Sequence, residues 1–186
     1  MPTSPTGIWT SVENSRSGFT LIELSVALLL VVLLLSIAIP RLGEYADVEL
    51  KSAVKMLATT MRYLHNEASL RKTFYRLVYD LDHQRYYIEQ PIQDLNTGTI
   101  EFVRPRDLPI IPRRKLPPGV KFIEVEAHGG TPVREGTAFT LFTPYGTADP
   151  TTIHLQSARG REYTIHLGPY YGRVKILEGY HEFKYR

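Results

Sequence analysis

The sequence contains no cysteine, a single tryptophan and only a small excess of positive charge. Without cysteine the chain can form neither a disulfide framework nor a thiolate metal site. The formal net charge of +3, from 22 basic and 19 acidic residues, does not demand a nucleic-acid partner. With 43% hydrophobic and 22% charged residues over 186 positions, the composition is that of a globular domain with room for an anchor.

Motifs of common enzymes are missing too. The sequence has no G-x-S-x-G nucleophile elbow, no glycine-rich phosphate loop and no H-E-x-x-H helix. Asp80, Asp82 and His83 cluster at a predicted turn, where aspartate is expected for turn geometry. We therefore expect a protein that is not an enzyme and needs no cofactor.

One long apolar run stands out. Residues 19–39 carry a single charged side chain, Glu23, among residues that are apolar or small. As a helix this run would be about 31 Å long, close to the hydrocarbon thickness of a bilayer. Because lipid offers no water to backbone groups, such a run must be helical. A carboxylate inside it needs an explanation, because a charge in lipid is costly and usually marks a functional site.

Three interpretations of Glu23 compete. It can be a carboxylate near the membrane end of an ordinary anchor, where it reaches toward water. It can be an unusual residue in a secretory signal peptide, although the run is long for one and no small-residue cleavage site precedes Pro40 and Arg41. Alternatively, a cut after Gly18 frees an amine on Phe19, one helical turn from Glu23 on the same face. The two charges would then neutralise each other, within one chain or between neighbours.

The string Gly18-Phe19-Thr20-Leu21-Ile22-Glu23, followed by the apolar run and Pro40, resembles the class III signal of type IV pilins and type II secretion pseudopilins. The resemblance implies that a prepilin peptidase cuts after Gly18 and that the new terminus, Phe19, is N-methylated. It also implies that Glu23 guides docking onto a filament and that Pro40 kinks the helix. Residues 1–18 would be a cytoplasmic leader that is removed, and residues 19–42 a transmembrane and assembly helix.

Residues 43–72 are predicted to continue this helix with an amphipathic pattern. Its apolar stripe, spaced by threes and fours, consists of Leu50, Val54, Leu57, Met61, Leu64 and Ala68. Contact with neighbouring subunits is one interpretation of the stripe. Packing on the sheet of its own domain is the simpler one, and we expect it here.

From residue 73 onward the apolar period changes to two, which indicates strands. We predict strands at 74–81, 85–90, 99–103, 120–126, 138–142, 152–157, 162–167 and 173–177, separated by turn-forming residues. A hairpin is expected around residues 82–84, and Val174 and Ile176 should face inward. The prediction is an α+β fold in which a long N-terminal helix packs on an antiparallel β-sheet domain, residues 73–186.

Three strings in the C-terminal half resemble the GspH/FimT subgroup of the same family: LPPGV from Leu116, FTLFTPYGTAD from Phe139 and GRVKI from Gly172. The subgroup comprises the minor pseudopilin H of type II secretion and the FimT-type minor pilins. The resemblance implies a pilin-like fold and a single-pass inner-membrane protein with a cytoplasmic N-terminus and a periplasmic β-rich domain. Its partners would be major and minor pseudopilins, the prepilin peptidase and the inner-membrane assembly platform.

A basic, proline-rich segment is a further candidate surface. Its cations are Arg104, Arg106, Arg113, Arg114 and Lys115, against one acidic residue, Asp107. They would suit DNA phosphates or an acidic partner subunit. A solvated, proline-stiffened loop is the simpler interpretation, although the apolar residues 108–111 indicate that part of it packs on the domain. Arg159-Gly160-Arg161 is expected to be an exposed hairpin tip.

The string Thr-Ile-His-Leu occurs twice, at 152–155 and 164–167. Strand alternation predicts that His154 and His166 lie side by side on one sheet face. Two histidines without a carboxylate or third ligand nearby in the sequence fall short of a metal site, which normally needs three or four ligands. We expect cross-strand pairing on a water-exposed face and no metal.

The resemblance implies a minor pseudopilin of the type II secretion system, near the pseudopilus tip, that helps to export folded proteins across the outer membrane. A FimT-type minor pilin that binds DNA during uptake is the first alternative, which salt-sensitive DNA binding would favour. Residues 178–186 hold two acidic and two basic residues, so this tail is not an obvious DNA clamp. A membrane-anchored periplasmic binding protein that never assembles is the second alternative, and failure to cut after Gly18 would favour it.

Overall fold

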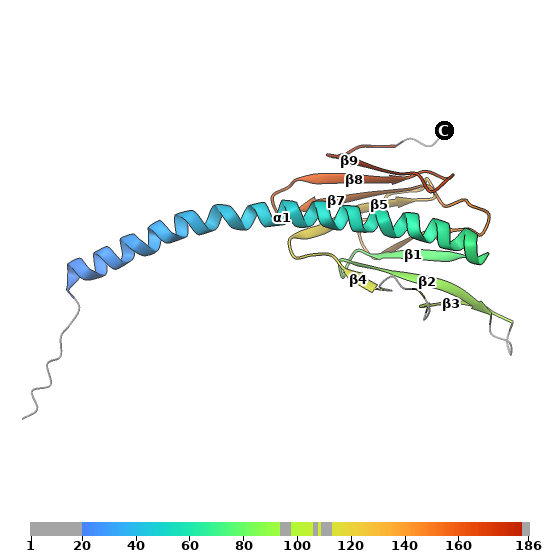
Figure 1. The fold of residues 1–186 in the computed structure, drawn as a ribbon, viewed down its shortest axis with the longest axis horizontal. Coiled ribbons are helices and arrows are strands. Elements are labelled where there is room, and N and C mark those ends of the chain that lie inside the picture. Colours follow the sequence, from blue (N-terminus) through green and yellow to red (C-terminus); the bar gives the residue numbers. More distant parts are fainter. Residues whose placement is uncertain (1–19, 94–97, 106–107, 109–112, 184–186) are drawn as a thin grey trace, which may run out of the picture. The chain divides into compact units, whose positions relative to one another are not determined.

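The computed structural model describes residues 20–93, 98–105, 108 and 113–183, without the side chains of residues 37–46 and of Arg113. In this part of the chain one helix, α1 (Leu21–Arg71), precedes all the strands (Figure 1). The strands are β1 (Tyr75–Asp80), β2 (Arg85–Gln93), β3 (Ile100–Val103), β4 (Arg113–Lys115), β5 (Val120–Ala127), β6 (Thr137–Phe142), β7 (Thr151–Ser157), β8 (Glu162–Leu167) and β9 (Val174–Glu178). The chain forms two compact units, Met1–Pro40 and Arg41–Arg186, and the second contains all the strands.

The strands form two antiparallel sheets. The first has the order β3-β2-β1-β6, and β4 pairs with β2 beside this path. Both β3 and β4 pair with β2, β4 with residues 85–87 and β3 with residues 90–93. The second sheet has the order β5-β7-β8-β9, with neighbouring strands antiparallel throughout. The turn at residues 81–84 joins β1 to β2, as the predicted hairpin requires.

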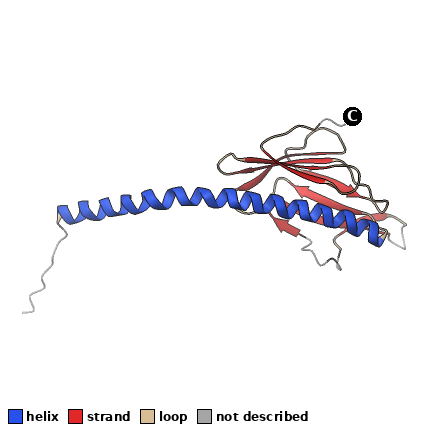
Figure 2. Ribbon diagram, turned by 45° about the horizontal axis from the view of Figure 1, so that its top comes forward, coloured by secondary structure: helices blue, strands red, loops and turns tan. Residues whose placement is uncertain are grey.

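The C-terminal part of α1 packs on both sheets (Figure 2). The apolar stripe of α1 is buried throughout, with Leu50, Leu57, Met61, Leu64 and Ala68 at 0% exposure and Val54 at 1%. The core side chains that accompany it include Tyr75, Leu77 and Tyr79 of β1, Ile153 and Leu155 of β7, and Ile165 and Leu167 of β8. Removing one such side chain from water stabilises the fold by about 1.5–3 kcal/mol. The stripe therefore serves the core of its own domain, as predicted.

The α+β prediction is confirmed, and each predicted strand is present with shifts of three residues or fewer at its ends. The segment 113–115 is the correction, because it forms β4 where a loop is the simpler expectation from sequence. Its Arg-Arg-Lys sequence has no apolar alternation, so no periodicity signal is available. What holds β4 is backbone pairing with residues 85–87 of β2.

Candidate functional site

The first turn of α1 begins at a side-chain cap. The backbone N–H of Glu23 donates to Oγ1 of Thr20 over 3.3 Å, so Thr20 is the N-cap and Glu23 the third helical residue. A threonine followed three residues later by glutamate is the capping-box spacing. Thr20 is not among the site residues predicted above, although this spacing is readable in the sequence. The cap places the carboxylate of Glu23 at the positive end of the helix dipole.

Of the predicted processing residues, Gly18 and Phe19 lie outside the described residues. Every described side chain from Thr20 to Ser36 is exposed, including Leu21 at 84%. A continuous apolar surface of this extent marks a contact with a membrane or with another protein. Among the described residues, no helix is both long enough and apolar enough to span a membrane.

Pro40 lies within α1, which is helical on both sides of it. The side chain of Pro40 lies outside the described part of the chain. Pro40 is the last residue of the first compact unit. The kink at this residue therefore stays a prediction.

Among the described residues, the cations of the basic segment belong to β4 and to the residue that follows β3. Arg104 is exposed and lies 5.5 Å from the ring centre of Tyr87, a cation–π distance. Arg114 and Lys115 belong to β4, while Arg106 and the side chain of Arg113 lie outside the described residues. Leu108 packs against the core, which confirms that part of the segment is held by the domain.

The two histidines of the repeated string lie on one face of the second sheet, as predicted, but the predicted side-by-side pairing is wrong because they are diagonal neighbours. His154 is opposite Thr164 and His166 is opposite Thr152. The expectation of a water-exposed face is wrong, because His154 is 3% exposed. The ring of Tyr180 stacks on His154 at 4.1 Å between centroids, and Phe183 stacks on His166 at 3.8 Å.

We call residues 179–183 the C-terminal strap. Thr164 holds its backbone, since Oγ1 donates to the carbonyl of Gly179 over 2.7 Å and accepts the N–H of His181 over 3.0 Å. Gly179 has a φ of 91°, a conformation that favours glycine, and this turn lets the chain fold back over β8. The strap has no apolar period, so the sequence offers no signal that it covers a sheet face.

Glu124 of β5 is a buried carboxylate beneath the strap, with 2% exposure. It accepts hydrogen bonds from Oη of Tyr180 over 2.7 Å and from Nε of Arg134 over 2.9 Å. Its Oε1 also lies 3.9 Å from Nε2 of His154. Burial alone would raise the pKa of Glu124, but these hydrogen bonds and the nearby positive charges outweigh it and hold the pKa below its usual value. The same carboxylate raises the pKa of Tyr180 to about 12, mainly through their hydrogen bond.

Burial lowers the pKa of His154 and of His166, so both favour the neutral form. Within the described part of the chain, no cluster of three or more histidine, cysteine, aspartate or glutamate side chains is arranged to hold a metal ion. The chemistry of this face is thus hydrogen bonding and ring stacking that hold the strap in place.

Two of the strings that resemble the GspH/FimT subgroup meet at His65 of α1. Nε2 of His65 is 3.0 Å from the carbonyl oxygen of Gly146, and its ring packs directly on Gly172. The two loops present Tyr145, Tyr170 and Tyr171 to solvent at 63–84% exposure. His65 therefore joins segments that are far apart in the sequence, and sequence spacing alone does not reveal this.

The model of the prokaryotic N-terminal methylation motif matches residues 14–39. Two solved structures of the minor pseudopilin EpsH from the type 2 secretion system of Vibrio cholerae are similar to this chain. One is 15% identical, with a TM-score of 0.52 over 70% of this chain and 97% of that chain. The other is 18% identical, with a TM-score of 0.56 over 72% of this chain and 97% of that chain. No curated protein matches the sequence.

At these identities the likeness to the solved structures shows the fold alone. The resemblance to type IV pilins and H-type pseudopilins is thereby confirmed for the N-terminal motif and for the pilin-like fold.

Proposed function

From the N-terminal methylation motif and the pilin-like fold, we propose that this chain is a minor pseudopilin of a type II secretion system. It acts as a near-tip structural subunit of the periplasmic pseudopilus and helps to move folded proteins across the outer membrane. The observation that carries the proposal is the continuity of the chain. The motif over residues 14–39 includes the N-terminal part of α1, and the C-terminal part of α1 packs on a two-sheet domain that is similar in fold to solved minor pseudopilins.

In this proposal the prepilin peptidase cuts after Gly18 and the new amine of Phe19 is methylated. Residues 19–42 anchor the subunit in the inner membrane before assembly, and the domain lies in the periplasm. The exposed apolar side chains from Leu21 to Leu35 support this, because they have no cover within the described part of the chain. Packed against the same helices of other subunits, they would form an apolar core that replaces lipid.

Glu23 sets the register in this core. A carboxylate moved from the membrane end into a helical bundle is strongly destabilising unless a partner neutralises it. The amine of Phe19 on the subunit already in place is such a partner. The capped first turn supports this role, because it holds Glu23 three residues after Thr20, close to the proposed terminus. A carboxylate that docks on a preceding subunit also argues against the extreme tip position.

The processing step is tested by expressing the full chain with and without a prepilin peptidase and measuring its intact mass. We expect loss of residues 1–18 and a gain of one methyl group on Phe19. A Gly18→Leu variant, which changes only the residue before the cut, should keep its full mass. A full-length product in the presence of active peptidase would favour the anchored, non-assembling protein instead.

Secretion is tested by comparing the proteins in the medium of a strain that lacks this gene with those of its complemented parent. We expect specific folded proteins to disappear from the medium and to return on complementation. Complementation with Glu23→Ala should fail although the subunit is made and processed. An unchanged medium together with reduced DNA uptake would replace the secretion proposal with the FimT-type alternative.

A further inference from the structure

The last strand of the second sheet, β9, has one edge that no described strand covers. Among the described residues β9 pairs with β8 alone, from Tyr163 opposite Glu178 to Leu167 opposite Val174. The N–H of Gly168 donates to the oxygen of Arg173, and the N–H of Gly179 donates to the oxygen of Glu162. These two bonds show which opposite residues of β8 and β9 form hydrogen-bonded pairs. Antiparallel pairs alternate between bonded and non-bonded. The backbone groups of Val174, Ile176 and Glu178 therefore point away from β8.

The described residues satisfy this outer edge only at its two ends. Nη2 of Arg62 donates to the oxygen of Val174 over 3.0 Å, and Nε2 of His181 lies 2.9 Å from the oxygen of Glu178. Between them, the N–H and C=O of Ile176 and the N–H of Glu178 have no hydrogen-bond partner within the described part of the chain. One strand position thus presents both a donor and an acceptor to a possible neighbour.

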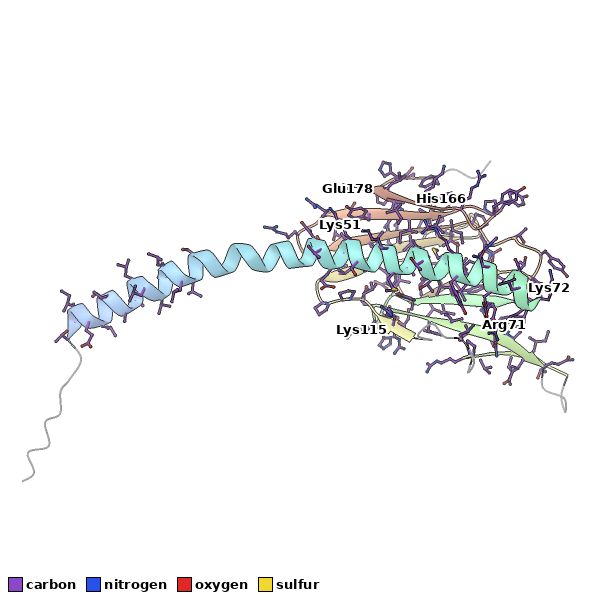
Figure 3. All side chains as sticks on the ribbon, in the orientation of Figure 1. Lys51, Arg71, Lys72, Lys115, His166 and Glu178 are labelled. Carbon is purple, nitrogen blue, oxygen red and sulfur yellow. The ribbon has the colours of Figure 1, made fainter. Side chains whose placement is uncertain are left out.

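A row of cations on α1 flanks this edge. Lys51, Lys55 and Arg62 are spaced by four and seven residues, so they lie on one face of the helix, and all three are exposed. Arg62 touches the start of β9, as described above. Lys51, labelled on α1 in Figure 3, lies one helical turn beyond Asp47.

At the other end of the row, Asp47 is linked through Arg161 to the last residue of β9. Its Oδ2 lies 3.6 Å from Nη1 of Arg161, and Nε of Arg161 lies 3.9 Å from Oε1 of Glu178. The helix row and β9 therefore run side by side. Lys175 and Arg173, both exposed, add positive charge along β9, while Val174 and Ile176 pack against the core.

We propose that this edge binds an extended, acidic segment of a partner protein, which adds to the second sheet beside β9. Backbone hydrogen bonds to an exposed strand edge supply affinity in such β-addition, and side-chain contacts supply specificity. Here the cations Lys51, Lys55, Arg62 and Lys175 select for carboxylates on the incoming strand. They also disfavour a second copy of this chain, because pairing two β9 edges would bring the two cation rows together.

The test uses the full chain in non-ionic detergent and an end-blocked peptide of alternating valine and glutamate. We expect the peptide to bind, to lose affinity as salt is raised, and to bind more tightly than the same peptide with lysine in place of each glutamate. Amide exchange at residue resolution should then slow at Ile176 and Glu178. The amides of Lys175 and Leu177 should not change, since they already bond to β8.

Two matched variants locate the contact. Lys55→Glu should weaken binding of the glutamate peptide by about fivefold and improve binding of the lysine peptide. Lys121→Glu, an exposed site on β5 at the opposite edge of the sheet, should change neither. A third variant, Glu178→Pro, removes an outward N–H without removing a bond to β8, so it should reduce the slowed exchange at Ile176.

Several outcomes would overturn the proposal. They are an absence of binding at millimolar peptide, equal binding of the two peptides, and binding that leaves the amides of Ile176 and Glu178 unprotected. Equal effects of Lys55→Glu and Lys121→Glu would also do so. The proposal does not rest on the secretory role, because none of these measurements uses processing, assembly or secretion.

Discussion

Gly172 brings backbone with a φ of 56° against the ring of His65. A Cβ at this position would lie 2.7 Å from Cγ of His65 and 2.8 Å from its Nδ1. The ring is held on its other side by the carbonyl of Gly146. Gly172→Ala should therefore combine the cost of a left-handed backbone with overpacking, and lower the free energy of unfolding by about 2–4 kcal/mol.

Urea unfolding of the two proteins measures this loss, and Gly160→Ala is its matched control. Gly160 has a φ of 82° but open space around the added Cβ. Gly160→Ala should lose only the contribution of the backbone conformation, about 1 kcal/mol of the free energy of unfolding. Equal losses at the two glycines would show that His65 does not constrain this turn.

Tyr180 carries a second prediction at residue scale. Tyr180→Phe keeps the ring that stacks on His154 but removes the donor to Glu124, which leaves a buried carboxylate short of one bond. We expect a loss of about 1–3 kcal/mol in the free energy of unfolding at neutral pH. Because the pKa of Glu124 is lower in the folded chain than its unfolded value of 4.5, the ionised carboxylate stabilises the fold at pH values above 4.5. This contribution disappears as the pH falls through the folded pKa.

The difference between Tyr180→Phe and the parent should consequently be largest above about pH 5 and narrow toward pH 3. Urea unfolding at a series of pH values measures it. A difference that stays constant with pH would mean that the hydroxyl does not act through the charge of Glu124.

At the scale of elements, we expect the two histidines beneath the C-terminal strap of the second sheet to make the fold less stable in acid. His154 and His166 have folded pKa values lowered by burial, with the charge of Lys175 adding to the effect at His166. Histidine in the unfolded chain has a pKa of 6.5. As the pH falls below this value, the unfolded chain therefore binds protons before the folded chain does. The melting temperature should fall between about pH 7 and pH 5.5, and His154→Gln/His166→Gln should flatten this dependence. A slope equal to that of the parent would contradict the burial of these rings.

The elements differ in how far the sequence predicts them. The stripe of α1 and strands such as β8 follow from periodicity, because one side of each faces the core. The class III signal likewise lies in one continuous string, and its match covers residues 14–39. β4 escapes prediction because backbone pairing holds it, and the strap because ring stacking does. Glu124 escapes for another reason: its partners Arg134, His154 and Tyr180 come from three separate segments, so no local pattern joins them.

At the scale of the whole molecule, strands of the two sheets differ in how their backbone is paired. In the first sheet β2 is an interior strand, paired with β1 on one side and with β4 and β3 on the other. In the second sheet β9 pairs on one side only within the described part of the chain, and cations lie beside its other side. An unprotected edge invites non-specific pairing, and charged residues beside it restrict that pairing. We therefore expect the β9 edge to accept a selective partner, apart from the apolar helix that the proposed filament would bury.

The core of the second unit makes the C-terminal part of α1 indispensable to the sheets. A fragment that begins at Glu44 keeps the whole buried stripe and the hydrogen bond from Ser157 to Asp47, so it should unfold in one cooperative transition. A fragment that begins at Ala58 loses Leu50, Val54 and Leu57, all at 1% exposure or less. At about 2–5 kcal/mol for each side chain, the loss matches or exceeds the whole stability of a typical domain. Circular dichroism with urea unfolding should find the first fragment folded and the second unfolded. If the second fragment kept the stability of the first, the two sheets would be stable without residues 44–57 of α1 and the buried side chains that they contribute.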